Sequence, residues 1–175
     1  GYDDLLVSSP GAGAVYVLFG KVDTTGFQPA YDLEDLSGAD GMALTGLNTD
    51  PTVGLVATNV GDVSGGGVDD LLIASVAASG EGRAYLVFGE AGATDKLDLE
   101  TLDGSNGYIF ANIDFGLFDP VITASGLGDV NNDGINDIAL GAPEAGMSSN
   151  GQVLGLLGGT ENLLKLDALD GTIQK

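Results

Sequence analysis

Residues 128–143 read GDVNNDGINDIALGAP, an acidic, glycine-containing turn followed by an apolar run. Oxygen-bearing groups fall on alternate positions, namely the side chains of Asp129, Asn131, Asp133 and Asp137 and the backbone carbonyl of Ile135. Gly134 occupies the sixth position, where a calcium loop makes its sharp turn. The stretch then enters the apolar run 138–143, whereas an EF-hand loop enters a helix. We therefore predict a calcium loop between two β-strands.

The same arrangement recurs along the chain. Asp4, Asp70 and Asp137 lie 66 and 67 residues apart, and each opens an apolar run. A second apolar run follows at 15–20, 84–89 and 153–158, and a third element at 31–38, 97–104 and 164–171 reads YDLEDLSG, LDLETLDG and LKLDALDG. Three signals that recur in the same order at nearly the same spacing indicate tandem structural repeats.

Each repeat is predicted to contain four strands. The first strand, predicted at 53–60 and 120–127, precedes the metal loop. The fourth is predicted at 41–47 and 107–112. Alternate residues of the third strand are apolar on both faces, so we expect these strands to be covered on both sides. Stacked four-stranded sheets of a propeller satisfy this pattern. The predicted fold is therefore an all-β, partial β-propeller of about two and a half blades.

The blade boundaries follow from the period. We predict an incomplete blade at 1–47, a complete blade at 48–112, and a blade without its last strand at 113–175. Because a propeller usually needs about four to eight blades to close, we expect further blades from the same chain or from others.

Composition excludes several functions. The 175 residues carry 26 acids and 5 bases, a net charge of −21, which disfavours nucleic acid and anionic membrane surfaces as partners. The chain has no histidine and no cysteine, which removes the usual serine triad, the usual zinc ligands and disulfides. No apolar run reaches the length of about 18 residues that a membrane span needs, so we expect no membrane insertion.

The repeat resembles the FG-GAP repeat of integrin α-subunit propellers and their bacterial relatives. The pieces that carry the resemblance are Phe115-Gly116 and Gly141-Ala142-Pro143, with the calcium loop between them. The resemblance implies a seven-bladed propeller with calcium sites inside the blades, outside the cell. The first repeat keeps only Ser9-Pro10 of the second piece, and no residue matches a ligand-recognition motif of the integrins.

The three metal loops are unequal. The second loop retains the side chains of Asp62, Ser64 and Asp70 and the carbonyl of Val68, but Gly66 replaces the carboxylate of Asp133. We predict weaker calcium binding there, and the alternative is a glycine-rich hairpin without an ion. For the third loop the alternative is an Asx turn with solvated acids. The first loop retains only Asp4 and the carbonyl of Tyr2, and we expect it to hold no ion.

Two other residue sets invite functional interpretation. The aromatic residues Tyr16, Phe19, Tyr85, Phe88, Tyr108, Phe110, Phe115 and Phe118 could stack on sugars, but their places in strand runs favour core packing. The acid pairs Glu34/Asp35 and Glu81/Glu90 could be glycosidase carboxylates, but we expect solvated surface.

These observations predict a non-catalytic, calcium-binding module for adhesion, recognition or structural scaffolding at the cell surface or outside the cell. All predicted ligands of each ion come from one loop with no base or nucleophile beside it, so the predicted role of calcium is structural. The partner is an unidentified protein or glycan. Alternatives are an ancillary propeller domain of a secreted hydrolase and a glycan-binding propeller.

Overall fold

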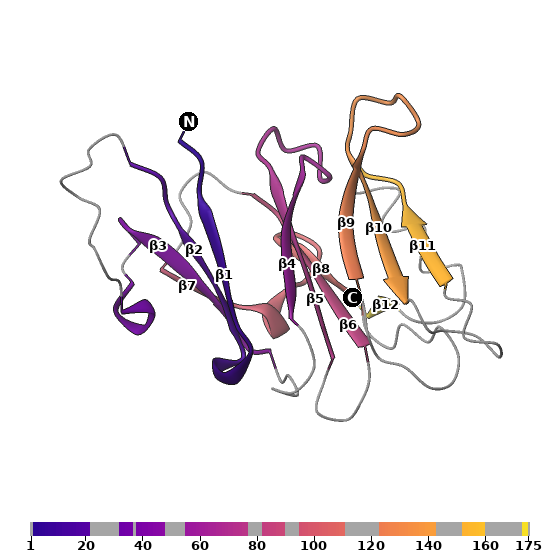
Figure 1. Ribbon diagram of the computed structural model, residues 1–175. Coiled ribbons are helices and arrows are strands. Elements are labelled where there is room, and N and C mark those ends of the chain that lie inside the picture. Colours follow the sequence, from indigo (N-terminus) through magenta and orange to yellow (C-terminus); the bar gives the residue numbers. More distant parts are fainter. Residues whose placement is uncertain are drawn as a thin grey trace.

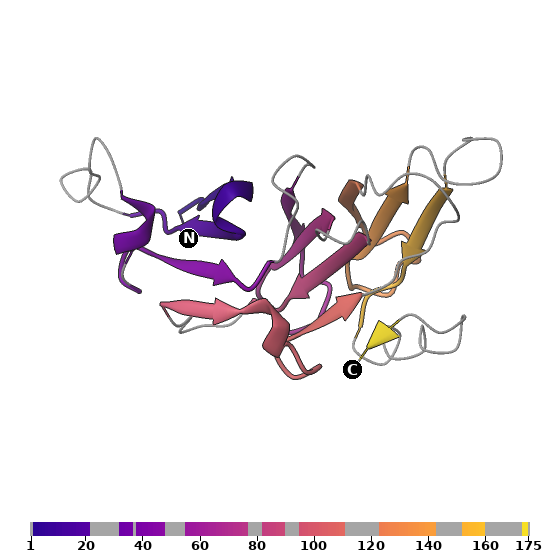
Figure 2. The ribbon, with the colours of Figure 1, turned by 90° about the horizontal axis from the view of Figure 1, so that it is seen from below.

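In the part of the chain that the structure describes, three β-sheets lie side by side (Figure 1), which confirms the predicted all-β fold. The computed structural model describes residues 2–21, 32–36, 38–47, 55–76, 82–89, 95–110, 123–142, 152–159 and 173–174. Short 3-10 helices are the helical elements of these ranges, and none of them is long enough to cross a membrane. Seen from below, the sheets fan out from one another, as blades of a partial β-propeller do (Figure 2).

The second sheet shows the predicted four-strand repeat in full. It contains β4 (Val56–Gly61), β5 (Asp70–Val76), β6 (Gly82–Val87) and β8 (Gly107–Phe110), each antiparallel to the strand that precedes it. The short strand β12 (Ile173–Gln174) pairs with the outer edge of β8. The predicted starts of the first strands, 53–55 and 120–122, fall largely outside the described residues, which begin at Leu55 and Thr123 there.

The first sheet contains one strand that the sequence did not reveal. Its members are β1 (Leu5–Ser9), β2 (Ala14–Leu18), β3 (Gly41–Thr45) and β7 (Lys96–Asp98). The strand β7 belongs to the second repeat in sequence, yet it pairs in parallel with β3 at the edge of the first sheet. The 3-10 helix η1 (Pro10–Ala12) forms the turn between β1 and β2. Neighbouring repeats are therefore joined by strand pairing as well as by side-chain packing.

The third sheet contains β9 (Thr123–Gly128), β10 (Asp137–Ala142) and β11 (Gln152–Leu156) within the described ranges. Gly141 and Ala142 of the second FG-GAP piece lie at the end of β10. The first FG-GAP piece, Phe115-Gly116, lies outside the described residues. The same holds for Glu81, Glu90, Phe118 and Pro143.

The core lies in the two seams between sheets. Val15, Val17 and Leu44 of the first sheet pack against Ile73, Tyr85 and Val87 of the second. On the other face of the second sheet, Leu72, Leu86 and Phe110 pack against Ile138, Leu140 and Leu156 of the third. The strands of the second sheet are therefore covered on both faces, as their two-sided apolar pattern predicts.

The aromatic residues of the described strands pack in this core. Tyr16, Tyr85, Tyr108 and Phe110 are buried, and Phe88 meets Tyr108 edge to face with ring centroids 5.6 Å apart. This arrangement favours the core interpretation over a sugar-stacking surface.

The third element of the repeat is a short 3-10 turn. It appears as η3 (Leu33–Asp35) and η4 (Leu99–Thr101), whose N-cap residues are Asp32 and Asp98. In each turn the aspartate accepts a hydrogen bond of 3.1 Å from the backbone N–H two residues later. Glu34 and Asp35 are exposed, as expected for solvated acids.

Candidate metal loops

Both predicted loops begin at a β-bulge. In the second sheet Gly61 pairs with Asp70 beside a register shift, and in the third sheet Gly128 pairs with Asp137 beside a matching shift. Each loop has three positions with positive φ: 72°, 80° and 83° at Gly61, Gly65 and Gly67, and 69°, 61° and 90° at Gly128, Asn132 and Gly134. The two loops therefore have the same backbone shape, and they lie at the same end of the sheets (Figure 1).

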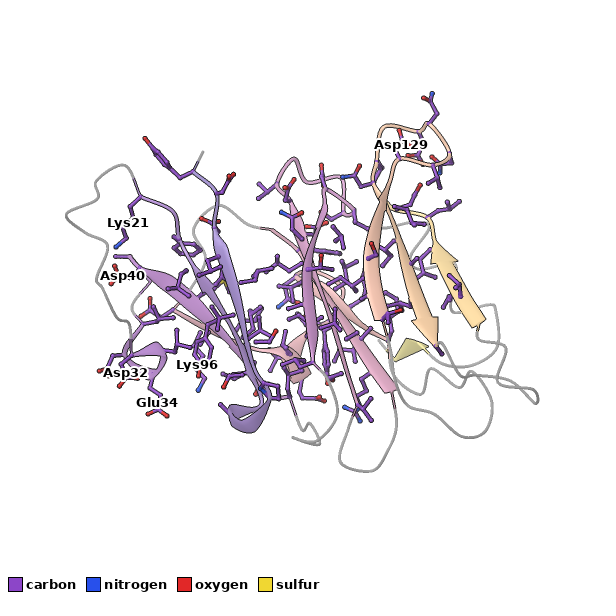
Figure 3. All side chains as sticks on the ribbon, viewed as in Figure 1. Lys21, Asp32, Glu34, Asp40, Lys96 and Asp129 are labelled. Atoms are coloured by element: carbon purple, nitrogen blue, oxygen red, sulfur yellow. The ribbon has the colours of Figure 1, made fainter. Side chains whose placement is uncertain are left out.

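In the third loop the predicted ligands are held by the backbone of the turn. Figure 3 labels Asp129 in this loop. The carboxylate of Asp129 accepts hydrogen bonds from the N–H groups of Asp133 at 3.0 Å and Gly134 at 2.8 Å. The Asn131 side chain accepts from the Asp133 N–H at 3.0 Å and donates to the Asp133 carboxylate at 2.8 Å. Asp133 also accepts from the N–H of Ile135 at 2.9 Å. Asp129, Asn131 and Asp133 thus form one exposed, oxygen-rich turn.

The second loop repeats these bonds with fewer oxygens. The carboxylate of Asp62 accepts from the N–H groups of Gly66 at 2.9 Å and Gly67 at 2.8 Å, the positions of Asp133 and Gly134. The Ser64 hydroxyl lies 3.4 Å from a carboxylate oxygen of Asp62. Because Gly66 has no side chain, this loop lacks the oxygen that Asp133 offers in the third loop.

The last predicted ligand of the second loop, Asp70, is fully buried. One of its oxygens accepts from the N–H of Gly89 at 2.7 Å, and the other accepts from the N–H groups of Val63 at 2.8 Å and Ser64 at 2.6 Å. Asp70 therefore joins the start of the loop to the end of β6.

The same connection recurs in the other two sheets. Asp137, also fully buried, accepts from the N–H of Gly158 at 2.8 Å and from that of Val130 at 2.8 Å. In the first sheet Asp4 accepts from the N–H of Gly20 at 2.7 Å. This aspartate thus has a structural role in every repeat, whether or not the rest of the loop is present.

Three equivalent glycines make this connection possible. A Cβ on Gly20, Gly89 or Gly158 would lie 2.3, 2.3 and 2.1 Å from the carbonyl oxygens of Asp3, Asp69 and Asn136. Only glycine allows so close an approach of two backbones. The recurrence of glycine at the end of each second apolar run was visible in the sequence, but its role was not.

The buried carboxylates create a need for positive charge. Burial raises the pKa of Asp70, although the hydrogen bonds from Gly89, Ser64 and Val63 act in the opposite direction. A buried carboxylate is costly unless it is paired or coordinates a metal. The ion pairs recorded in the described ranges, Lys21 with Asp40 and Arg83 with Glu100, do not include Asp70 or Asp137.

A hard cation fits this donor set. Carboxylate, amide, hydroxyl and carbonyl oxygens are the ligands that calcium takes, and each carboxylate oxygen can accept more than one partner, so the loop hydrogen bonds leave capacity for an ion. Within the part of the chain that the structure describes, no three acidic, histidine or cysteine side chains lie grouped as a metal cluster. Coordination by Asp129, Asn131, Asp133, Asp137 and the Ile135 carbonyl therefore stays a prediction, as does that by Asp62, Ser64, Asp70 and the Val68 carbonyl.

The two loops also contact each other across the seam between their sheets. The backbone N–H of Asn136 donates to the carbonyl of Asp62 at 3.0 Å, and the N–H of Gly159 donates to the carbonyl of Val63 at 2.7 Å. Asn136 directly precedes Asp137, and Asp62 is the first predicted ligand of its own loop. Asp62 of the second loop is thus joined to the third loop by one backbone hydrogen bond.

Comparisons with known proteins agree with the repeat. Residues 122–156, which contain the third loop, match the model of the FG-GAP repeat. Over 117 residues, 62% of this chain, the sequence is 38% identical to integrin alpha-8 of Gallus gallus, and the match covers 10% of that protein's length. The predicted resemblance to the FG-GAP repeats of integrin-like propellers is confirmed.

Proposed function

We propose that this chain is a non-catalytic, calcium-binding propeller module that serves adhesion, recognition or structural scaffolding at the cell surface or outside the cell. The observation that supports the proposal is the turn at 129–137, in which Asp129, Asn131 and Asp133 are exposed and joined by hydrogen bonds, and Asp137 is buried at the start of β10. The donor set is that of a hard divalent cation.

The proposed role of calcium is to stabilise the loops. Each loop concentrates carboxylates in a chain whose net charge is −21, and their mutual repulsion opposes folding. A divalent ion neutralises them and ties the exposed turn to the buried aspartate at the root of the sheet. Extracellular modules bind calcium with Kd values of about 10⁻⁴–10⁻³ M, a range that suits the calcium concentration outside cells.

Thermal unfolding tests the calcium part of this proposal. At about 10 mM calcium and a Kd in this range, binding stabilises the folded chain by about 1.4–2.7 kcal/mol. For a chain of this size that corresponds to a rise of about 3–10 °C in Tm. Magnesium is the control, since a small ion that prefers octahedral geometry should stabilise the chain less. Superimposed unfolding curves with calcium and with excess chelator would contradict the proposal.

The adhesion part rests on the similarity to integrin alpha-8 and on the absence of obvious catalytic chemistry from the sequence, which has no histidine and no cysteine. Attachment of cells to surfaces coated with the chain, in calcium and in chelator, measures it directly. We expect attachment that calcium supports and that Asp129→Ala weakens. Attachment equal to that on an albumin-coated surface would argue against an adhesive role for this segment.

A further inference from the structure

The peptide groups on either side of Val63, in the second loop, are hydrogen-bonded from two directions. One group joins Asp62 to Val63, and the next joins Val63 to Ser64. The N–H groups of Val63 and Ser64 donate to the same oxygen of the Asp70 carboxylate, at 2.8 Å and 2.6 Å. Asp70 is fully buried. The position of this predicted ligand therefore fixes the position of both peptide groups.

The carbonyls of the same two peptide groups accept hydrogen bonds from the third repeat. The N–H of Asn136 donates to the carbonyl of Asp62 at 3.0 Å, and the N–H of Gly159 donates to the carbonyl of Val63 at 2.7 Å. Each peptide group thus lies between the Asp70 carboxylate and a backbone donor of the third repeat.

The two donors of the third repeat flank a hydrogen bond of the other buried aspartate, Asp137. Asn136 directly precedes Asp137, and Gly159 directly follows Gly158, whose N–H donates to the Asp137 carboxylate at 2.8 Å. Asp137 is fully buried. Two buried aspartates, each a predicted ligand of its own loop, are therefore connected through the peptide groups beside Val63.

Close packing leaves this connection little room to move. A Cβ on Gly158 would lie 3.0 Å from the carbonyl oxygen of Val63 and 2.7 Å from the side chain of Ile135. The Val63 side chain is fully buried, in one cluster with Ile138 and Leu156 of the third sheet. A close-packed interior transmits displacements, so a change in one loop reaches the other.

We propose that the second and third loops bind calcium cooperatively, and that the peptide groups on either side of Val63 carry the coupling. The inference rests on the calcium binding proposed above. Hydrogen bonds at the two ends of one peptide group polarise each other, so strengthening one strengthens the other. Asp70, once fixed by an ion, holds these peptide groups and with them the segments that flank Asp137. By linkage, each occupied loop raises the calcium affinity of the other by the same factor.

Nuclear magnetic resonance measures the calcium Kd of each loop separately in the 175-residue chain. Amides of residues 65–67 follow the second loop, and those of residues 133–135 follow the third. The ionic strength is held at about 0.15 M, where repulsion between two ions is screened over about 8 Å.

The first variant is Asp133→Ala, which weakens the third loop. The recorded hydrogen bonds of Asp133 stay within that loop, so the connection to the second loop is untouched. We expect the Kd of the second loop to rise about three- to tenfold, the effect of one hydrogen bond. The reciprocal variant, Asp62→Ala, removes a carboxylate but keeps the backbone carbonyl, and it should raise the Kd of the third loop by the same factor.

The matched control is Asp103→Ala. It removes one negative charge from an exposed acid in the turn before β8, and Asp103 is not a predicted ligand. Both Kd values should stay within about twofold of those of the natural chain, since only screened charge is lost.

Hydrogen exchange tests the connection itself. In the Asp133→Ala chain, calcium at the second loop should slow the exchange of the Asn136 and Gly159 amides, although both belong to the third repeat. Unchanged exchange of these amides while the second loop binds calcium would overturn the coupling. So would a reciprocal change of less than about twofold in either Kd, and in both cases the proposed calcium binding would stand. If neither loop of the natural chain binds calcium, the proposed function itself is wrong, and the coupling falls with it.

Discussion

Gly66 is the position at which the second metal loop departs from the third, and it offers a direct test of the metal prediction. The substitution Gly66→Asp introduces the carboxylate that Asp133 supplies in the third loop. Gly66 is not among the glycines with positive φ, and the nearest atom to a Cβ built there is the Ser64 hydroxyl oxygen at 3.3 Å. Because the loops have the same backbone shape, the new side chain should reach the same place.

The expected gain in calcium affinity follows from electrostatics. A carboxylate and a divalent ion 4 Å apart attract each other by about 2 kcal/mol at the dielectric constant of water. Repulsion between the new carboxylate and those of Asp62 and Asp70 is present with and without the ion, so it lowers the stability of the calcium-free chain. We therefore expect calcium affinity at this loop to rise about ten- to thirtyfold.

Titration calorimetry with calcium measures this effect on the whole chain. Only the weaker of the two sites should change, since the third loop is untouched. The matched control is Gly67→Asp, which adds the same charge at a position with φ of 83°, where a side chain is strained. An affinity within twofold of the natural chain, or an equal gain from the control, would refute the reasoning.

Three further predictions concern the loops and the core. Gly158→Ala should lower the free energy of unfolding, measured in urea, by about 3 kcal/mol or more. The new Cβ would lie 2.1 Å from a backbone oxygen and would displace the hydrogen bond from Gly158 to a buried carboxylate. The control Gly155→Ala, where a Cβ meets nothing within 4 Å, should change the free energy of unfolding by less than about 1 kcal/mol. Asp133→Ala should lower calcium affinity more than Ser64→Ala, because it removes a carboxylate and not a hydroxyl, and equal losses in calorimetry would contradict the order. Burial raises the pKa of Tyr85 to about 12. Because the folded chain favours the neutral phenol, the free energy of unfolding should fall by at most about 2–3 kcal/mol as the pH rises from 10 towards 12. Tyr85→Phe should remove that part of the fall, as measured by unfolding curves at alkaline pH.

Much of the fold could be predicted because local pattern and period agree. The apolar runs at 15–20 and 84–89 overlap strands β2 and β6, and the fourth strands lie within the predicted ranges 41–47 and 107–112. A strand with apolar residues on both faces must be covered on both faces, and stacked sheets are one of the few arrangements that do this. The sequence therefore also indicated how the strands pack.

The strand β7 shows where this reasoning ends. Lys96–Asp98 pairs in parallel with β3, a strand that lies more than fifty residues earlier in the chain. Three residues with a single apolar side chain between two charged ones carry no strand signal of their own, and the pairing depends on where the following sheet places them. The role of Asp4 could not be predicted from the sequence either. Its carboxylate accepts a hydrogen bond from the N–H of Gly20, a contact that becomes visible only when β1 and β2 are paired.

The contacts between loops explain why these loops lie at the seams of the sheets. The segment Asp62–Val63 belongs to the second loop, yet its two carbonyls accept hydrogen bonds from Asn136 and Gly159 of the third repeat, and the Val63 side chain fills the core between the sheets. An ion that orders the second loop therefore also fixes the surface on which the third sheet packs. In a chain of like-charged repeats, stability depends on such nearest-neighbour interfaces. Calcium at one loop should accordingly stabilise the adjoining sheet as well as its own, so that unfolding of neighbouring repeats becomes more cooperative when the loops are occupied.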